Sequence, residues 1–205
     1  DETIPVMANA KKYFDRYARL KRTAEAVTEQ LAESEAELEH LTSIKASLDN
    51  ARTEADLADI REELAAAGYA KKHQEAGGRG GKNGKKERRR AKSAPMHFLS
   101  SDGFDIYVGK NNFQNDALTF QFAHGNDWWF HTKKAAGSHV ILVTEGKEVP
   151  DRAFEEAAKL AVHFSSANPR SESNPDGDPH SRAEVDYVLK KEVKKPNAAK
   201  PGFVV

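Results

Sequence analysis

The stretch from Asp127 to Leu142 gathers residue types that often carry chemistry in proteins. It holds both tryptophans of the chain, two of its eight histidines and a Gly-Ser-His turn. Such a set is compatible with a catalytic pocket, with an aromatic platform for nucleic-acid bases, or with the middle of a hydrophobic core. The rest of the sequence has to distinguish these three interpretations.

Nucleophilic catalysis has little support. Ser138 and His139 are adjacent, and adjacent side chains of an extended chain point to opposite faces, so the two cannot form a nucleophile–base pair. The sequence also lacks the G-x-S-x-G turn that presents a catalytic serine in many hydrolases. We therefore expect a protein that is not an enzyme.

Metal and nucleotide sites are poorly supported as well. The histidines within residues 124–139 match no compact ligand spacing, and the chain has no cysteine. The Gly-Lys pair within Val108–Asn112 lacks the other residues of a phosphate-binding loop. We expect no metal and no cofactor, and we expect this turn to present Lys110 and the two amides after it outward.

RNA recognition requires planar groups that stack on bases, amides that bond to base edges and cations that hold phosphates. The second half of the chain supplies all three, in Trp128–His131, in Asn111–Asn115 and in several lysines. Trp128 and Trp129 would face opposite sides of a strand, so at least one of them belongs to the core. A protein-interaction domain that binds no RNA is the open alternative.

The bulk composition divides the chain into three parts. Of 205 residues, 38% are hydrophobic and 31% are charged, and the net charge is zero. Residues 1–70 carry 9 Lys and Arg against 15 Asp and Glu, residues 71–95 carry 10 against 2, and residues 96–205 carry 13 against 15. The basic middle part is where a polyanion is expected to bind. No apolar stretch approaches the roughly 20 residues that cross a bilayer, so we expect no membrane partner.

Residues 1–70 predict a coiled-coil segment. Apolar residues recur at alternating steps of four and three from Tyr13 to Leu41, with charged residues between them. A second helix over about residues 54–67 is expected to end at Gly68. This helix is too short to cover the apolar seam, so the seam needs a partner, either upstream sequence or a second chain.

The remaining residues predict a flexible basic linker, 71–95, and an α+β head, 96–205. Strands are expected at 104–109 and 138–143, an amphipathic helix at 150–167, and a strand or hairpin at 183–196. The expected fold class is therefore α+β, with an N-terminal coiled-coil helical segment followed by a mixed α/β head.

Three blocks of the head closely resemble the NFACT-R domain: DGFDIYVGKNNFQNDALT, DWWFHTKKAAGSHVIL and VDYVLKKEVKKPNAAKPGFVV. The blocks NAKKYFDRYARLKR and DLADIREELAAAGY resemble the returning half of the central coiled coil in the same family. The blocks resemble the variant found in bacterial RqcH proteins, also called fibronectin-binding protein A. The resemblance implies that an incoming helix from an N-terminal half of the protein, missing here, packs on the apolar seam.

The resemblance also implies a function. Such proteins are cytoplasmic ribosome-quality-control factors that bind the obstructed large ribosomal subunit through its rRNA, bind tRNA, and in the full-length protein recruit alanyl-tRNA. They support template-free alanine tailing of stalled peptides, while the ribosome performs the peptide transfer. The older family name leaves a surface adhesin that binds fibronectin as an alternative, beside a generic protein-interaction domain.

The positions that match the family's motifs form the RNA-facing surface that the resemblance implies. For Gly137 and Asp116, a role in shaping the turns stands beside direct contact. The implied RNA-binding residues are Gly109, Lys110, Asn111, Asn112, Asn115, Asp116, Asp127, Trp129, His131, Lys133, Gly137, Ser138, His139, Lys194, Lys195, Pro196 and Lys200.

Overall fold

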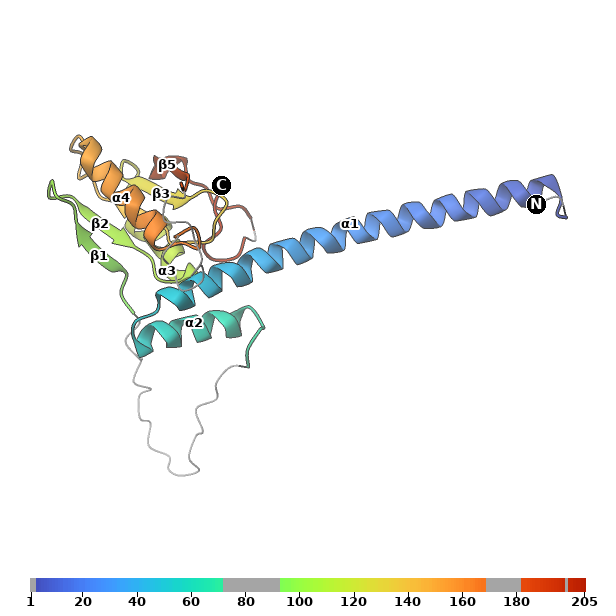
Figure 1. Cartoon of the computed structure of the whole chain (residues 1–205), viewed down its shortest axis with the longest axis horizontal. Coiled ribbons are helices and arrows are strands. Elements are labelled where there is room, and N and C mark those ends of the chain that lie inside the picture. Colours follow the sequence, from blue (N-terminus) through green and yellow to red (C-terminus); the bar gives the residue numbers. More distant parts are fainter. Residues whose placement is uncertain (1–2, 72–92, 169–181, 198) are drawn as a thin grey trace, which may run out of the picture. The chain divides into compact units, whose positions relative to one another are not determined.

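The computed structural model describes residues 3–71, 93–168, 182–197 and 199–205, so most of the expected linker lies outside the described residues (Figure 1). The chain divides into two compact units, residues 1–41 and residues 42–205. The second unit begins well before Met96, where the sequence predicts the head to start. The reason is that the helical residues from 42 onward pack with the head.

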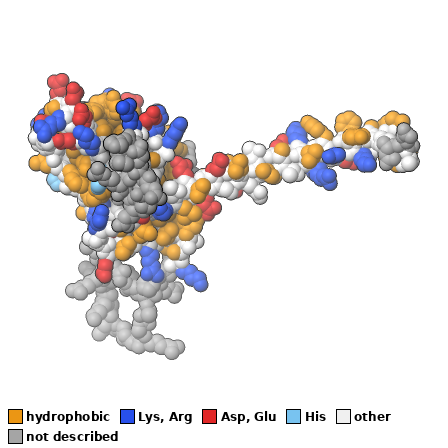
Figure 2. Space-filling model, viewed as in Figure 1, with side chains coloured by type: hydrophobic (Ala, Val, Ile, Leu, Met, Phe, Trp, Pro, Cys, Tyr) orange, Lys and Arg blue, Asp and Glu red, His pale blue; other side chains and the backbone are white. Residues whose placement is uncertain are grey.

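Helix α1, Val6–Asn50, is a single helix of 45 residues that confirms the helical part of the coiled-coil prediction. Within the first unit its apolar seam is bare, and the side chains of Tyr13, Tyr17, Leu20, Val27, Leu31 and Leu38 are each more than half exposed. Hydrophobic side chains are visible along the helix in Figure 2. No described residue of this unit covers the seam.

Helix α2, Glu54–Ala66, begins and ends as the sequence predicts. Thr53 caps its first turn by accepting a hydrogen bond from the Asp56 N–H, and the Asp56 carboxylate accepts from the Thr53 N–H in return. This reciprocal capping box satisfies two backbone donors at the start of the helix. Gly68 follows the helix with φ of 85°, the left-handed conformation that glycine adopts without strain.

The head contains one five-stranded antiparallel sheet with the order β1-β2-β4-β3-β5. Among the described residues, the longest helix of the head is α4, which follows Pro150 as expected. None of the helices in these residues is long and apolar enough to cross a membrane. The elements are β1 Met96–Leu99, β2 Asp105–Val108, α3 Asn112–Ala117, the π-helix η1 Leu118–Phe122, β3 Trp128–Thr132, β4 Val140–Leu142, α4 Asp151–His163, β5 Val185–Leu189 and the 3-10 helix η2 Lys190–Glu192.

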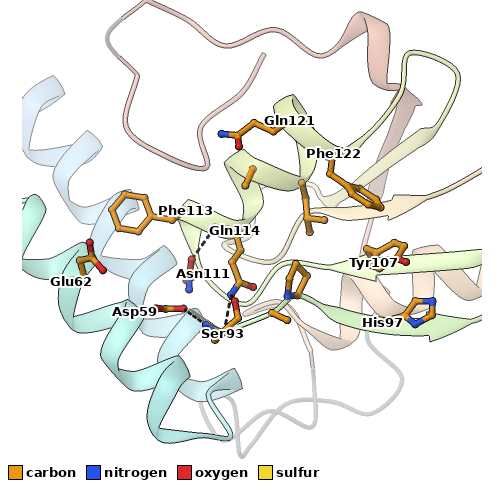
Figure 3. A pocket seen from close by; sticks show the side chains of 14 residues that line it. Asp59, Glu62, Ser93, His97, Tyr107, Asn111, Phe113, Gln114, Gln121 and Phe122 are labelled. Carbon is orange, nitrogen blue, oxygen red and sulfur yellow. Dashed lines mark hydrogen bonds between the residues drawn. The ribbon is translucent and has the colours of Figure 1, made fainter. Parts of the chain in front are cut away.

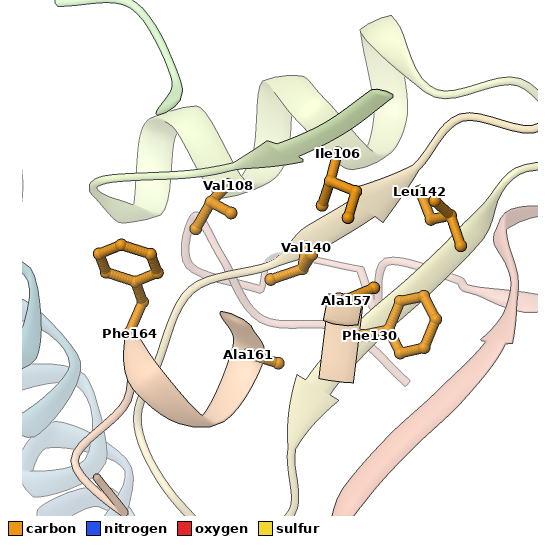
Figure 4. Packing of buried hydrophobic residues seen from close by; sticks show 8 residues of the cluster. All are labelled: Ile106, Val108, Phe130, Val140, Leu142, Ala157, Ala161 and Phe164. Atoms are coloured by element: carbon orange, nitrogen blue, oxygen red, sulfur yellow. The ribbon is translucent and has the colours of Figure 1, made fainter. Parts of the chain in front are cut away.

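Each face of the sheet has its own hydrophobic core because side chains alternate along the strands. On one face α4 covers a cluster that includes Phe130 (Figure 4). Trp128 is partly buried and packs against this cluster. On the other face η1 and the C-terminal residues cover Ile141 and Trp129. The two tryptophans therefore point to opposite faces, as the alternation predicts, and both contribute to packing. The structure confirms the α+β fold class.

Candidate nucleic-acid interface

The turn of residues 109–112 packs against helix α2 and does not point outward. Lys110 Nζ lies 2.9 Å from Asp56 Oδ1, and the Asp56 side chain is almost completely buried. Burial alone would raise the pKa of Asp56, but hydrogen bonds from Ser93, Lys110 and the Arg52 N–H hold this pKa well below its usual range. The expectation that the turn presents its cation to solvent is therefore corrected: a carboxylate 54 residues away in the sequence holds Lys110.

A second residue pair, Asn112 and Glu63, connects the same turn to helix α2. Asn112 Nδ2 donates to Glu63 Oε1 at 2.7 Å and to Ser43 Oγ at 2.8 Å. Burial raises the pKa of the Glu63 carboxyl, and its hydrogen bonds from Asn112 oppose that rise. Asn112 is buried in this contact, so the amide that was expected to face outward joins the head to both helices instead.

Asn111 and Asn115 complete the turn from inside. Asn111 is the N-cap of α3 and accepts the Gln114 N–H at 2.9 Å. Asn115 Oδ1 accepts the His139 N–H at 3.0 Å, and its Nδ2 donates to the Gly137 carbonyl at 3.4 Å. A Cβ atom on Gly109 would overlap the Asn115 side chain, which explains the glycine at that position.

The histidines of the central motif pack with Trp129: His139 and Trp129 are buried, and His131 is half-buried. The Trp129 and His131 rings stack with centroids 5.7 Å apart, and the His139 ring meets each of them edge-on. His139 Nδ1 lies 2.8 Å from Thr119 Oγ1. Burial, followed by the nearby His131, lowers the pKa of His139 to about 3, and burial also lowers the pKa of His131. The Trp129 and His139 rings are core groups, and the buried Trp129 offers no open face for stacking on a base.

The remaining acidic and small residues of the set also shape turns. Asp127 is buried and accepts the N–H groups of His124 at 2.7 Å and Thr144 at 2.9 Å. Asp116 accepts the Gly202 N–H at 3.0 Å and pairs with Lys195. A Cβ atom on Gly137 would lie 2.7 Å from the Ser165 Cβ, and Ser138 is buried beside it. Asp116, Asp127 and Gly137 therefore all take part in contacts that hold turns in place.

The exposed cations of the implied set lie elsewhere. Lys133 is exposed and pairs with Glu184 at 3.3 Å. Lys194, Lys195 and Pro196 are exposed after η2, and Lys200 Nζ lies 5.9 Å from the centre of the Tyr69 ring. With Lys190 and Lys191 these lysines form the basic segment, defined here as Lys190, Lys191, Lys194, Lys195 and Lys200.

Lys190, Lys191 and Lys194 make no ion pair with any residue that the structure describes. The backbone of Lys190 and Lys191 bonds to the turn before β3, at the carbonyls of Asp127 and Gly125. The basic segment therefore continues from the end of the edge strand β5, and its Lys191 and Lys194 are exposed to solvent, where phosphates can bind them.

Three features of the described residues were not predicted from the sequence. Tyr187 on the edge strand β5 is 57% exposed, while its ring also packs against Trp128, Phe130 and Phe154. Asp56 and Glu63, which hold the turn, lie in a helix whose sequence gives no sign of a partner. In the first unit, the otherwise acidic segment begins with exposed cations interleaved with aromatic rings at Tyr13, Phe14 and Tyr17. These cations are Lys11, Lys12, Arg16, Arg19, Lys21 and Arg22.

Comparison with known proteins agrees with this two-part architecture, a helical arm joined to a small α+β domain. Residues 1–83 match the family model described as the NFACT N-terminal and middle domains, and residues 94–174 match the model described as the NFACT protein RNA binding domain. The chain belongs to the NFACT family, in the group of bacterial RqcH and fibronectin-binding protein A.

Individual relatives match along the whole chain. The protein called Rqc2 homolog RqcH from Streptococcus suis (strain 05ZYH33) is 34% identical over 206 residues, which cover 100% of this chain and 33% of that protein. The protein of the same name from Bacillus subtilis (strain 168) is 35% identical over 196 residues, covering 96% of this chain and 31% of that protein. The chain thus spans about a third of the length of the curated relatives it matches.

A solved structure has the same fold. It is the C-terminal part of the fibronectin/fibrinogen-binding protein from Streptococcus suis, which matches with a TM-score of 0.75 and 34% identity. The match covers 98% of this chain and 73% of that one. The likeness therefore includes both the helical arm and the head.

Proposed function

We propose that this chain is the RNA-binding part of a ribosome-quality-control factor. It binds the obstructed large ribosomal subunit and tRNA, and it supports template-free alanine tailing of stalled peptides in the cytoplasm. The observation that carries the proposal is the match of proteins called RqcH along the whole chain, together with an RNA-binding family model over the head. Membership of this family supports an RNA-binding role in ribosome quality control.

The basic segment is the surface we assign to RNA phosphates. Its ammonium groups supply charge without sequence specificity, and the exposed Tyr187 ring can stack on an unpaired base. The cations near the start of α1 supply a second, separate set of phosphate contacts. The buried members of the motif set act indirectly, because they hold the turns that position these surfaces.

We further propose that the chain acts by binding and not by catalysis. A general base is most effective when its pKa lies near the working pH. The pKa of His139, lowered to about 3, makes its imidazole a weak base, and its Nδ1 already bonds to Thr119. Selection of alanyl-tRNA and peptide transfer are assigned to the full-length factor and to the ribosome.

The experiment is a salt series of the affinity for 50S subunits and for free tRNA. Triple variant Lys191→Ala, Lys194→Ala, Lys200→Ala removes exposed cations of the basic segment, and variant Lys12→Ala, Arg16→Ala, Arg19→Ala removes the α1 set. Each phosphate that a variant no longer neutralises should flatten the slope of log K against log salt by about 0.7 to 0.9.

The matched control is Lys45→Ala, Lys147→Ala, Lys159→Ala, which removes three lysines that pair with neighbouring carboxylates. It has the same change in net charge and should leave most of the slope intact. If neither variant flattens the slope more than the control does, RNA binding would be assigned to residues 71–95, and the surfaces named here would be refuted. Absence of binding at low salt would refute RNA binding by this chain.

Fibronectin binding is the second candidate, because the solved relative carries that name. It predicts that immobilised fibronectin captures the chain at physiological salt, and that 50S subunits do not compete. Capture that disappears with the basic segment variant and is displaced by tRNA would instead indicate nonspecific attraction to charge.

A further inference from the structure

The second unit contains a hollow of about 680 Å³ that the RNA-binding role does not use. It lies between α2, residues 93–95, strands β1 and β2, and the α3–η1 helix (Figure 3). This volume is within the usual range for binding pockets in proteins. All of its walls belong to one compact unit, so the hollow is a fixed feature of the head with its attached helix.

One end of the hollow is aromatic. The Tyr107 and Phe122 rings meet edge-on with centroids 4.7 Å apart, and His97 stacks on Tyr107 at 4.7 Å. Phe122, on the side of Tyr107, is 43% exposed, and Phe113, which lies near Glu62 on the opposite side, is 36% exposed, although both rings line a concave surface (Figure 3). Exposed aromatic rings that line a cavity are typical of binding sites.

The other end of the hollow is acidic. Asp59 and Glu62 extend from α2 toward it, on the side away from Tyr107 and His97 (Figure 3). The Asp59 carboxylate accepts the Ser93 N–H at 3.2 Å, and Glu62 is exposed and makes no ion pair with a described residue. Within the described part of the chain, the residues that line the hollow include no lysine and no arginine. Its field therefore attracts a cation and repels a phosphate.

We propose that this hollow binds an extended peptide segment of a partner protein. A bulky apolar side chain of the peptide lies against Tyr107 and Phe122, and a neighbouring Lys or Arg pairs with Asp59 and Glu62. Charge complementarity selects this occupant over a nucleotide, because a base placed among the rings would bring its phosphate toward two carboxylates without a cation to hold it. The lining shares no residue with the basic segment, so one chain can hold RNA and a protein at once.

The test is an NMR titration of the 205-residue chain with three synthetic octapeptides and with adenosine monophosphate. The cationic probe is Gly-Ser-Lys-Trp-Leu-Arg-Gly-Ser. The acidic probe has Glu in place of Lys and Arg, and the third probe has Ala in place of Trp and Leu. We expect the cationic probe to shift the signals of Ala117 and Leu118, and to bind at least about fivefold more tightly than the other probes, since an apolar anchor and a charge pair both contribute.

Two variants locate the site. Phe122→Ser removes part of the aromatic wall and should weaken the cationic probe by at least about fivefold. Gln121→Arg adds a cation at the rim without removing a ring, and should weaken the cationic probe while strengthening the acidic one. Leu57→Ser, an exposed apolar residue on α2 outside the lining, is the control and should change neither affinity.

Any one of three results with the probes would overturn the proposal. They are equal or tighter binding of adenosine monophosphate, equal binding of the acidic and cationic probes, and no shift at Ala117 and Leu118 with any probe at millimolar concentration. A cationic probe whose affinity is unchanged in Gln121→Arg would also overturn it, because the charge would then act elsewhere.

Discussion

Asn115 illustrates how single polar residues work in this head. Its side chain accepts from the His139 N–H and donates to the Gly137 carbonyl, so one buried amide joins the turn after β2 to the turn before β4. A buried polar group left without its partner costs about 1–3 kcal/mol. Residues of this kind are therefore constrained by the fold alone, before any ligand is considered.

His139 gives a pH dependence with a definite sign. Its pKa is lowered to about 3 in the folded state, so below pH 6.5 the unfolded state binds a proton that the folded state excludes. Stability should therefore fall as the pH decreases from 6.5 toward 3, by up to about 1.4 kcal/mol per pH unit. Urea unfolding followed by tryptophan fluorescence at pH 7 and pH 5 measures this loss.

The variant His139→Gln separates this contribution from the others. The lowered pKa of His131 acts in the same direction, and the raised pKa of Glu63 acts in the opposite one, because a carboxyl with a raised pKa stabilises the fold as the pH falls. The loss between pH 7 and pH 5 should shrink in His139→Gln and persist in the exposed control His124→Gln. An equal loss in all three proteins would contradict the assignment to His139.

At the scale of elements, the joint between α2 and the head depends on two polar pairs. Lys110 binds Asp56, and Asn112 binds Glu63, both with little access to solvent. Removing one partner of a buried ion pair leaves the other charge without compensation, and this is usually more costly than the pair is favourable. The turn of residues 109–112 is therefore a structural connection between helix and sheet.

Lys110→Ala tests this connection. It should lower the free energy of unfolding by about 2–4 kcal/mol, because the Asp56 carboxylate stays buried without its ammonium group. Lys159→Ala removes an exposed pair with Glu155 and should cost less than about 1 kcal/mol. If Lys110 served RNA alone, its replacement would leave stability unchanged and reduce only the affinity for RNA, so urea unfolding decides between the two roles.

The sequence predicts the regular elements of this protein better than the uses of its polar residues. The residue pattern locates α1, α2, α4 and the strands β2, β4 and β5, because burial leaves a recognisable pattern in the residues themselves. The four-residue strand β1 and the short α3–η1 helix leave no such pattern. The burial of Lys110 and Asn112 also cannot be predicted from the sequence, because their partners lie 54 and 49 residues away along the chain.

At the scale of the whole molecule, the bare seam of α1 predicts association. An exposed heptad stripe is unstable in water unless another helix covers it, and the N-terminal half of the factor remains our predicted partner. In its absence the chain should self-associate as its concentration rises. Sedimentation of the chain between micromolar and near-millimolar concentration should show this association.

Lysines on the seam should prevent it. We expect Leu20→Lys, Leu31→Lys, Leu38→Lys to stay monomeric over the same concentrations, since three charges cannot be buried between helices. The control Ala26→Lys, Ala32→Lys, Ala36→Lys adds the same charge off the seam and should associate like the parent chain. Association of the seam variant would show that another surface is responsible.

The contact between Gly109 and Asn115 also limits how the sequence can change over evolutionary time. A side chain at 109 overlaps Asn115, while a shorter residue at 115 leaves the His139 N–H without its acceptor. A substitution at either position alone would therefore lower the stability of the fold. Lineages of this family should therefore keep the pair together, or replace both residues at once along with a new acceptor for the turn.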